Sequence, residues 1–120
     1  MPSDSLNALT ERLRRFADER DWTQFHSPKN LAIGVAAEAG ELAAEFQWLD
    51  EAASRAPEPE RLARIRNEAA DVLLYLARLA DRLQFDLIEA ANAKIELNAQ
   101  KYPVERFAGS ARKYNDPGPR

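Results

Sequence analysis

The sequence predicts an all-α fold, a bundle of four main helices in which the two central helices lie antiparallel. Aliphatic, alanine and charged residues dominate its 120 residues and only four are glycine, a composition typical of helical proteins. Apolar residues recur at helical spacings of three and four along four separate runs. Capping residues and prolines mark the breaks between these runs.

The first helix is predicted over residues 4–20, where serine and aspartate caps precede a periodic run of leucines. The pattern breaks over residues 21–29, and we expect a loop there. Ser27 and Pro28 are a strong start signal, because serine caps free amides and proline is tolerated at the first helical position. The second helix is then predicted to run to about residue 49.

The third helix is predicted over residues 60–83 and the fourth over residues 87–100, with a connection over residues 50–59. The third helix is apolar on more than one side, which indicates a central position and burial in an oligomer, a homodimer or a homotetramer. Two glycines within the second helix, Gly34 and Gly40, predict the close approach of another backbone or of a ligand.

Charge and composition exclude several classes of protein. A net charge of −3 without a basic stripe argues against a nucleic-acid partner. There is no cysteine and His26 is the single histidine, which excludes disulfides, thiolate catalysis and histidine-rich metal sites. No apolar leader or membrane-length apolar run is present, so we expect a cytoplasmic protein without a membrane partner. Residues 1–103 are expected to form the single domain, and residues 104–120 a basic, partly disordered tail.

Two pairs of carboxylates stand at matching positions of the two central helices. Glu38 and Glu41 are three apart on the second helix, and Glu68 and Asp71 are three apart on the third. Antiparallel packing would let both pairs converge. Carboxylate clusters suit hard cations, here Mg²⁺ and also Mn²⁺. The alternative is a pair of solvated acidic faces, and Glu45 is either an outer neighbour of the site or merely solvated.

The spacing of these four carboxylates resembles the MazG-like all-α nucleotide pyrophosphohydrolase superfamily, and the surrounding segments are closer still to its dCTP pyrophosphatase branch. The segments are Arg20-Asp21-Trp22, Gln24-Phe25-His26, Pro28-Lys29-Asn30-Leu31, Glu38-Ala39-Gly40-Glu41-Leu42, Phe46-Gln47-Trp48, Glu68-Ala69-Ala70-Asp71-Val72-Leu73-Leu74-Tyr75 and Lys101-Tyr102-Pro103. The resemblance extends from about Phe16 to Tyr114, which is most of the chain.

The resemblance implies a magnesium-dependent enzyme that hydrolyses a nucleoside triphosphate to a nucleoside monophosphate and pyrophosphate. The implied metal ligands are Glu38, Glu41, Glu68 and Asp71. We take Glu38 and Glu41 as the catalytic residues and favour Glu38 as the carboxylate that orients or deprotonates the water. The expected substrate is a pyrimidine deoxynucleotide similar to dCTP, hydrolysed in nucleotide-pool sanitation.

Five residues are predicted to bind the substrate: Trp22, Trp48, Tyr75, Lys94 and Asn98. The tryptophans are candidates for stacking on the base, although packing is the usual role of a single tryptophan. Lys94 and Asn98 lie four apart on the fourth helix, and the resemblance places them in the substrate site; alone they would be an ordinary solvated face. Tyr75 either bonds a sugar hydroxyl or a phosphate, or is a satisfied core tyrosine.

The base preference is open. Vertebrate-like members of the branch carry a histidine on the first helix that helps to read the base, and the matching position here is Leu13. His26 is predicted to be structural, holding the loop onto the start of the second helix. Alternative functions are the same fold acting on dUTP or phosphoribosyl-ATP, and a non-catalytic helical oligomerisation or regulatory module.

Overall fold

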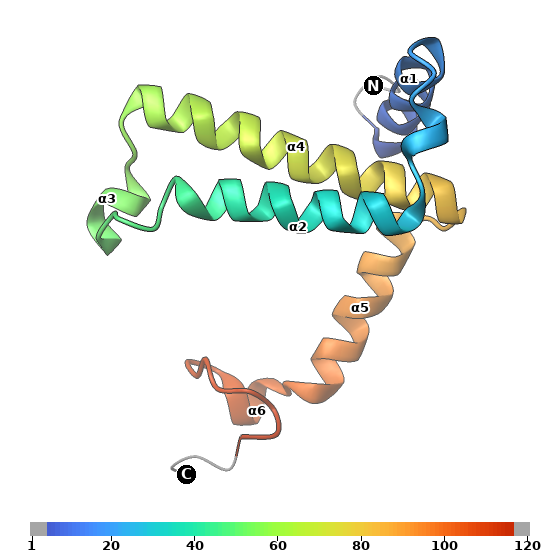
Figure 1. The fold of residues 1–120 in the computed structure, drawn as a ribbon. Coiled ribbons are helices and arrows are strands. Elements are labelled where there is room, and N and C mark those ends of the chain that lie inside the picture. The colour runs from blue at the N-terminus through green and yellow to red at the C-terminus, as the bar shows by residue number, and fades with distance from the viewer. Residues whose placement is uncertain (1–4, 117–120) are drawn as a thin grey trace. The chain divides into compact units, whose positions relative to one another are not determined.

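The computed structural model describes residues 5–116, and over this range the chain is helical, without a strand (Figure 1). The long helices are α1 (Leu6–Glu19), α2 (Pro28–Ala44), α4 (Pro59–Leu83) and α5 (Leu87–Lys101). The short ones are the 3₁₀ helix η2 (Thr23–Phe25), α3 (Glu51–Arg55) and α6 (Val104–Phe107). The predicted all-α class with four main helices is confirmed. None of these helices combines the length and apolar character that a membrane span needs.

Side-chain caps begin three of the long helices where the sequence predicts them. Ser5, Ser27 and Asp86 each accept a hydrogen bond from the backbone N–H three residues further on, at 3.0, 3.1 and 2.9 Å. Pro28 occupies the first turn of α2. Each cap satisfies an amide that has no partner within its own helix, so local chemistry defines these starts.

The antiparallel pair of α2 and α4 is the centre of the N-terminal part of the chain (Figure 1). Leu31, Ala77 and Ala80 are buried within it, with exposed fractions of 4% or less. At Gly34 the ring of Tyr75 lies so close that a Cβ atom would overlap it. Gly40, by contrast, has no such neighbour within 4 Å. The predicted close approach therefore holds for Gly34 and is not seen at Gly40.

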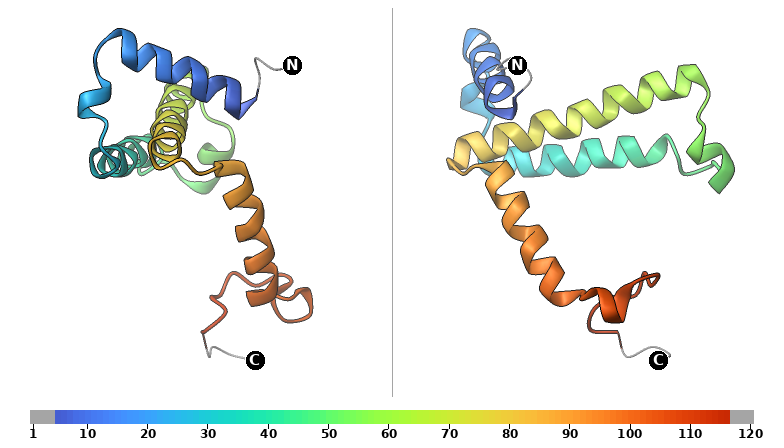
Figure 2. Two further views of the ribbon diagram at one scale, coloured as in Figure 1. Left: turned by 90° about the vertical axis from the view of Figure 1, so that its right-hand side faces the viewer. Right: turned by 180° about the vertical axis from the view of Figure 1, so that it is seen from behind.

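Helix α1 crosses the C-terminal half of α4 (Figure 2). Ala17 on α1 is fully buried. Arg14 on α1 binds Asp81 on α4 through two hydrogen bonds, of 3.1 Å from Nε and 2.5 Å from Nη2. The hydrogen bond from Arg14 holds the pKa of the Asp81 carboxyl below its usual value. These two hydrogen bonds hold α1 against α4 near its C-terminal end.

Two predicted irregular segments contain short helices. Helix α2 ends at Ala44 rather than near residue 49, and the cap Asp50 begins α3 within the predicted connection. In the predicted tail, α6 forms because its buried Phe107 packs edge-on against Tyr102, with ring centroids 4.9 Å apart. Both differences come from local caps and contacts that a search for long periodic runs does not detect.

The chain divides into two compact units, Met1–Phe85 and Asp86–Arg120. The domain boundary that the sequence predicts after residue 103 stays a prediction. The division follows the end of α4, where Gln84 adopts a left-handed conformation with φ of 58° and the chain leaves the helix axis. The acidic residues of α2 and α4 belong to the first unit and α5 belongs to the second.

Candidate functional site

Three carboxylates meet between the two central helices. Glu38 and Glu41 stand one turn apart on α2, and Glu68 faces them from α4. One oxygen from each lies within 4.8 Å of the others. The antiparallel packing of α2 and α4 brings together residues about thirty positions apart, and these are three of the four carboxylates that the sequence predicted to converge. Like charges at this separation repel, so the cluster needs a compensating charge or protons.

Two of these carboxylates are partly sealed from water. Within the described residues, Oε2 of Glu38 and Oε2 of Glu68 are buried and have no hydrogen-bond partner. Burial raises the pKa of both carboxyls above the usual value, and the hydrogen bond and charge of Glu41 raise it further. Buried acceptors without donors are uncommon in native proteins, and a hard divalent cation would satisfy both oxygens. The donor set therefore fits a divalent cation.

The remaining two acidic residues differ from this cluster. Asp71 is exposed and stands outside the three-carboxylate group, but its charge raises the pKa of both Glu38 and Glu68. It therefore lies close enough to contribute to the field of the site. Glu45 is held at the side of the cluster by two arginines of α4.

Glu45 is engaged by arginine rather than left free for a ligand. Its Oε1 lies 3.1 Å from Nε of Arg64 and 3.4 Å from Nη1 of Arg61. Arg61 also donates to the backbone carbonyl of Glu45 at 2.5 Å. Glu45 thus ties the end of α2 to the first half of α4, a peripheral role.

A cavity of about 180 Å³ adjoins Asp71 of α4. Its wall includes Trp22, His26, Asp71 and Tyr75, together with the apolar Leu13. A second cavity of about 280 Å³ shares Trp22, His26 and Tyr75. Two of the predicted substrate-binding residues, Trp22 and Tyr75, are thereby brought to one place beside a predicted metal ligand. Aromatic walls with a few polar groups are typical of small-molecule sites.

Trp48 lies elsewhere in the chain. It is 88% exposed and follows the C-terminal end of α2, whereas Trp22 precedes the N-terminal end. Helix α2 has 17 residues, which corresponds to about 25 Å of helix between the two tryptophans. Within one chain, Trp22 and Trp48 do not wall the same cavity.

The two polar residues predicted on the last long helix lie in the second compact unit. Lys94 and Asn98 are both exposed on α5, one turn apart. Their proposed contacts with phosphate and ribose stay a prediction. Lys101, one turn further on, lies 4.9 Å from the ring centroid of Tyr114 within the same unit.

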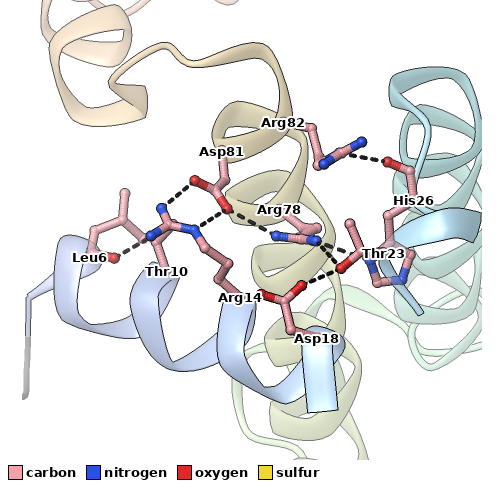
Figure 3. Close-up of polar contacts among 9 residues, drawn as sticks. All are labelled: Leu6, Thr10, Arg14, Asp18, Thr23, His26, Arg78, Asp81 and Arg82. Atoms are coloured by element: carbon pink, nitrogen blue, oxygen red, sulfur yellow. Dashed lines mark hydrogen bonds and ion pairs between the residues drawn. The ribbon is translucent and has the colours of Figure 1, made fainter. Parts of the chain in front are cut away.

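Sequence reasoning missed Arg78, the most buried charged residue of the described chain, with an exposed fraction of 3%. Its guanidinium donates to Nδ1 of His26 at 3.1 Å, to Asp81 at 3.0 Å and to Oγ1 of Thr23 at 3.1 Å (Figure 3). Arginine is seldom buried unless fully paired. The sequence feature that could have indicated its burial is its position between Ala77 and Leu79 in an apolar stretch.

These bonds give His26 a structural role, but they join its loop to α4 and not to the start of α2 as the sequence predicted. Nδ1 of its ring accepts from Arg78, and its backbone carbonyl accepts from Nε of Arg82 at 3.1 Å. Burial lowers the pKa of His26 below its usual value, and the charges of Arg78 and Arg82 lower it further. The imidazole is therefore neutral at physiological pH, and the loop that carries Trp22 is fastened to α4.

Comparison with known proteins identifies relatives of this arrangement. The MazG-like family matches residues 33–116. The chain is 43% identical to dCTP pyrophosphatase 1 of Rattus norvegicus over 117 residues, 96% of this chain and 69% of that protein. It is 45% identical to the protein of the same name from Bos taurus over 120 residues, 95% of this chain and 71% of that one.

A solved structure shows the same fold. The crystal structure of a pyrophosphatase from Archaeoglobus fulgidus superimposes with a TM-score of 0.74 at 40% sequence identity, covering 81% of this chain and 91% of that one. The relatives are pyrophosphatases, which agrees with the predicted class of hydrolase. A family match over most of the chain and identities above 40% across nearly all of it show that this chain belongs to the MazG-like family.

Proposed function

We propose that this chain hydrolyses a pyrimidine deoxynucleoside triphosphate, similar to dCTP, between its α and β phosphates in the presence of a divalent cation. The products are a nucleoside monophosphate and pyrophosphate. One observation carries the proposal: three carboxylates meet between α2 and α4, and two of their oxygens are buried without a hydrogen-bond partner. A role in clearing unwanted nucleotides from the cellular pool follows from this chemistry.

The residues that would hold the cation are Glu38, Glu41 and Glu68, with Asp71 beside them. When bound, Mg²⁺ or Mn²⁺ supplies the positive charge that the triphosphate and its transition state require. Glu38 orients the attacking water and accepts its proton, because its carboxylate stands at the cluster with one oxygen turned away from solvent. Glu41 stands within 4.8 Å of both other carboxylates and would supply the third ligand oxygen.

The base would occupy the cavity beside Asp71. Trp22 and Tyr75 offer aromatic faces there, and stacking on an aromatic ring contributes about 1–3 kcal/mol per base in nucleic-acid complexes. Lys94 and Asn98 are the proposed contacts for phosphate and ribose. Trp48, at the other end of α2, would reach the same substrate only from a second copy of the chain. We propose a pyrimidine as the base because two similar proteins are named dCTP pyrophosphatase 1.

A panel of nucleoside triphosphates with Mg²⁺, scored for pyrophosphate against orthophosphate, tests this function. We expect pyrophosphate from pyrimidine deoxynucleotides. Exclusive release of orthophosphate would contradict α–β cleavage, and hydrolysis of dUTP or phosphoribosyl-ATP alone would favour the alternative substrates. Absence of hydrolysis together with absence of Mg²⁺ binding would favour a non-catalytic helical module.

Glu38→Gln should lower kcat by about 10²–10⁴-fold, the usual contribution of a positioned general base. The substitution keeps the size of the side chain and removes the charge and the basic oxygen. The matched control is Glu51→Gln on α3, where the side chain is 88% exposed and forms only a long ion pair with Arg55. If both variants retain native kcat, Glu38 has no part in the chemistry.

A further inference from the structure

Four side chains of α4 share the face that meets α2 and follow one another along it. Their spacings of four, three and four residues place on one stripe of the helix Tyr75, Asp71, Glu68 and Arg64. The contacts of this stripe with α2 keep one antiparallel register: Tyr75 with Gly34, Glu68 with Glu41, and Arg64 with Glu45. The stripe therefore runs from the aromatic cavity through the acidic cluster to an arginine one turn beyond it.

Arg64 is positioned by its partner and still has free donors. Nε of Arg64 lies 3.1 Å from Oε1 of Glu45, and Arg61 holds the same carboxylate and the backbone carbonyl of Glu45. The hydrogen bonds of the described residues leave both Nη groups of Arg64 unused, and its side chain is 51% exposed. The planar guanidinium is thus oriented through Nε and presents its other N–H groups to an incoming ligand.

The position of Arg64 distinguishes it from the other basic residues of α2 and α4. Four residues separate it from Glu68, which places the two side chains one turn apart on the same face. Arg66 is only two residues from Glu68 and so points to another side of the helix, and Arg61 lies a further turn out. The remaining basic residues of the two helices stand at the cavity end of the pair: Lys29, Arg78 and Arg82.

We propose that Arg64 binds the terminal phosphate of the triphosphate and so holds the pyrophosphate that leaves. The proposal rests on the proposed hydrolysis and adds the direction in which the substrate lies along α4. With the base in the cavity at Tyr75 and the α–β linkage at the acidic cluster, the terminal phosphate extends toward the next turn, where Arg64 stands. Eleven residues of helix separate Tyr75 from Arg64, about 16 Å, which suits a nucleotide with an extended triphosphate.

A guanidinium suits the charge that develops in this position. In the proposed reaction, water forms a bond to the α phosphorus and gives its proton to Glu38, while the bond from that phosphorus to the α–β bridging oxygen breaks. The electron pair stays on the bridging oxygen, so pyrophosphate leaves with the added negative charge. Arginine binds phosphate oxygens through paired N–H donors and stays charged at physiological pH. Arg64 therefore places a positive side chain where the leaving group emerges from the acidic cluster.

Binding along a series of phosphate lengths tests this contact without catalysis. The ligands are dCMP and the α,β-imido analogues of dCDP and dCTP, each titrated with Mg²⁺ in a calorimeter. The native protein should gain affinity from the diphosphate to the triphosphate analogue, and Arg64→Gln should lose about tenfold to a hundredfold on the triphosphate analogue alone. Arg64→Lys, which keeps the charge without the planar fork, should retain part of the gain. An equal change along the whole series, or no change, would overturn the proposal.

Two further variants separate phosphate binding from a structural ion pair. Arg66→Gln makes the same change at an exposed position of α4 and should leave all three affinities within about twofold. Glu45→Gln removes the ion pair but keeps an acceptor oxygen for Nε of Arg64. It should bind the triphosphate analogue at least as tightly as the native protein does, because a negative charge beside the phosphate is gone. If Glu45→Gln and Arg64→Gln lose affinity equally, Arg64 only ties the helices together.

Hydrolysis of dCTP distinguishes this inference from the proposed function. If the native protein releases no pyrophosphate but Arg64→Gln selectively loses the triphosphate analogue, the hydrolysis fails while the phosphate contact stands. If pyrophosphate is released and Arg64→Gln keeps native kcat/KM and native affinity, the hydrolysis stands and the contact fails. Absence of binding to all three ligands in the native protein would overturn both. Arg64→Lys supplies the same comparison if the melting temperature shows that Arg64→Gln does not fold.

Discussion

At the scale of single residues, the site is defined by carboxylates that the fold holds in an unfavourable state. Glu38 and Glu68 each keep one oxygen buried without a partner, and burial raises the pKa of both carboxyls. Without a cation, the folded chain binds these protons more tightly than the unfolded chain does. The free energy of unfolding therefore falls as the pH rises from about 4.5 through the raised pKa.

A divalent cation should reverse the loss of stability that ionised Glu38 and Glu68 cause. At pH 7.5, Mg²⁺ at about 100 times its Kd should raise the melting temperature of the chelator-treated protein by on the order of 10 °C. Glu68→Gln should melt at a higher temperature than the native protein without Mg²⁺ and gain little from adding it. Glu51→Gln should respond as the native protein does. An equal response of Glu68→Gln and the native chain in thermal scans would place the cation elsewhere.

His26 contributes a pH dependence of the opposite sign. Burial and the charges of Arg78 and Arg82 lower its pKa below 6.5, so the unfolded chain binds the proton more tightly. The resulting stability is present above pH 6.5 and is lost as the pH falls through the lowered pKa. Urea unfolding at pH 7.5 and 5.5, with constant Mg²⁺, should show a smaller loss in His26→Asn than in the native protein. Equal losses would mean that His26 does not titrate in this window.

At the scale of helices, the site depends on how closely α2 and α4 approach. The ring of Tyr75 packs directly on the backbone of Gly34, which places the tyrosine in the cavity wall one turn from Asp71. Helical periodicity in the sequence indicated which residues face the partner helix. It did not indicate which of the two glycines is in contact, because that depends on the crossing of the two helices.

A pair of alanine substitutions separates packing from helix propensity. Gly34→Ala forces the Tyr75 ring aside and should destabilise the protein by about 1–3 kcal/mol, with weaker substrate binding as well. Gly40→Ala, in the same helix with open space around it, should instead stabilise by up to about 1 kcal/mol. Urea denaturation measures both. A stabilising Gly34→Ala would contradict the contact with Tyr75.

At the scale of the whole molecule, much apolar surface is left uncovered. Within the described residues, Ile33 is 58% exposed, Leu62 45% and Leu73 42%, and Trp48 is almost fully exposed. Surface of this kind on the two central helices is typical of an interface between subunits. The predicted homodimer or homotetramer is consistent with this exposure and stays a prediction.

Sedimentation of the native protein should give two or four times the mass of the chain. Ile33→Glu introduces a charge at an exposed apolar position of α2 and should shift the distribution toward the monomer, with loss of activity if assembly completes the site. Glu60→Lys, on the exposed first turn of α4, is the control and should leave the mass unchanged. A native monomer at micromolar concentration would refute the oligomer.

The sequence by itself determined the four long helices, the family and three of the four carboxylates that it predicted to converge, because caps, periodicity and residue spacing are local properties of the chain. It also indicated Trp22 and Tyr75 as partners of the acidic site. Only the tertiary structure decided that Glu45 is bound by Arg61 and Arg64, that Trp22 and Trp48 lie at opposite ends of α2, and that Arg78 fixes the ring of His26. These facts depend on which side chains meet across packed helices, and burial and hydrogen-bond pairing between distant residues leave no periodic signal in the sequence.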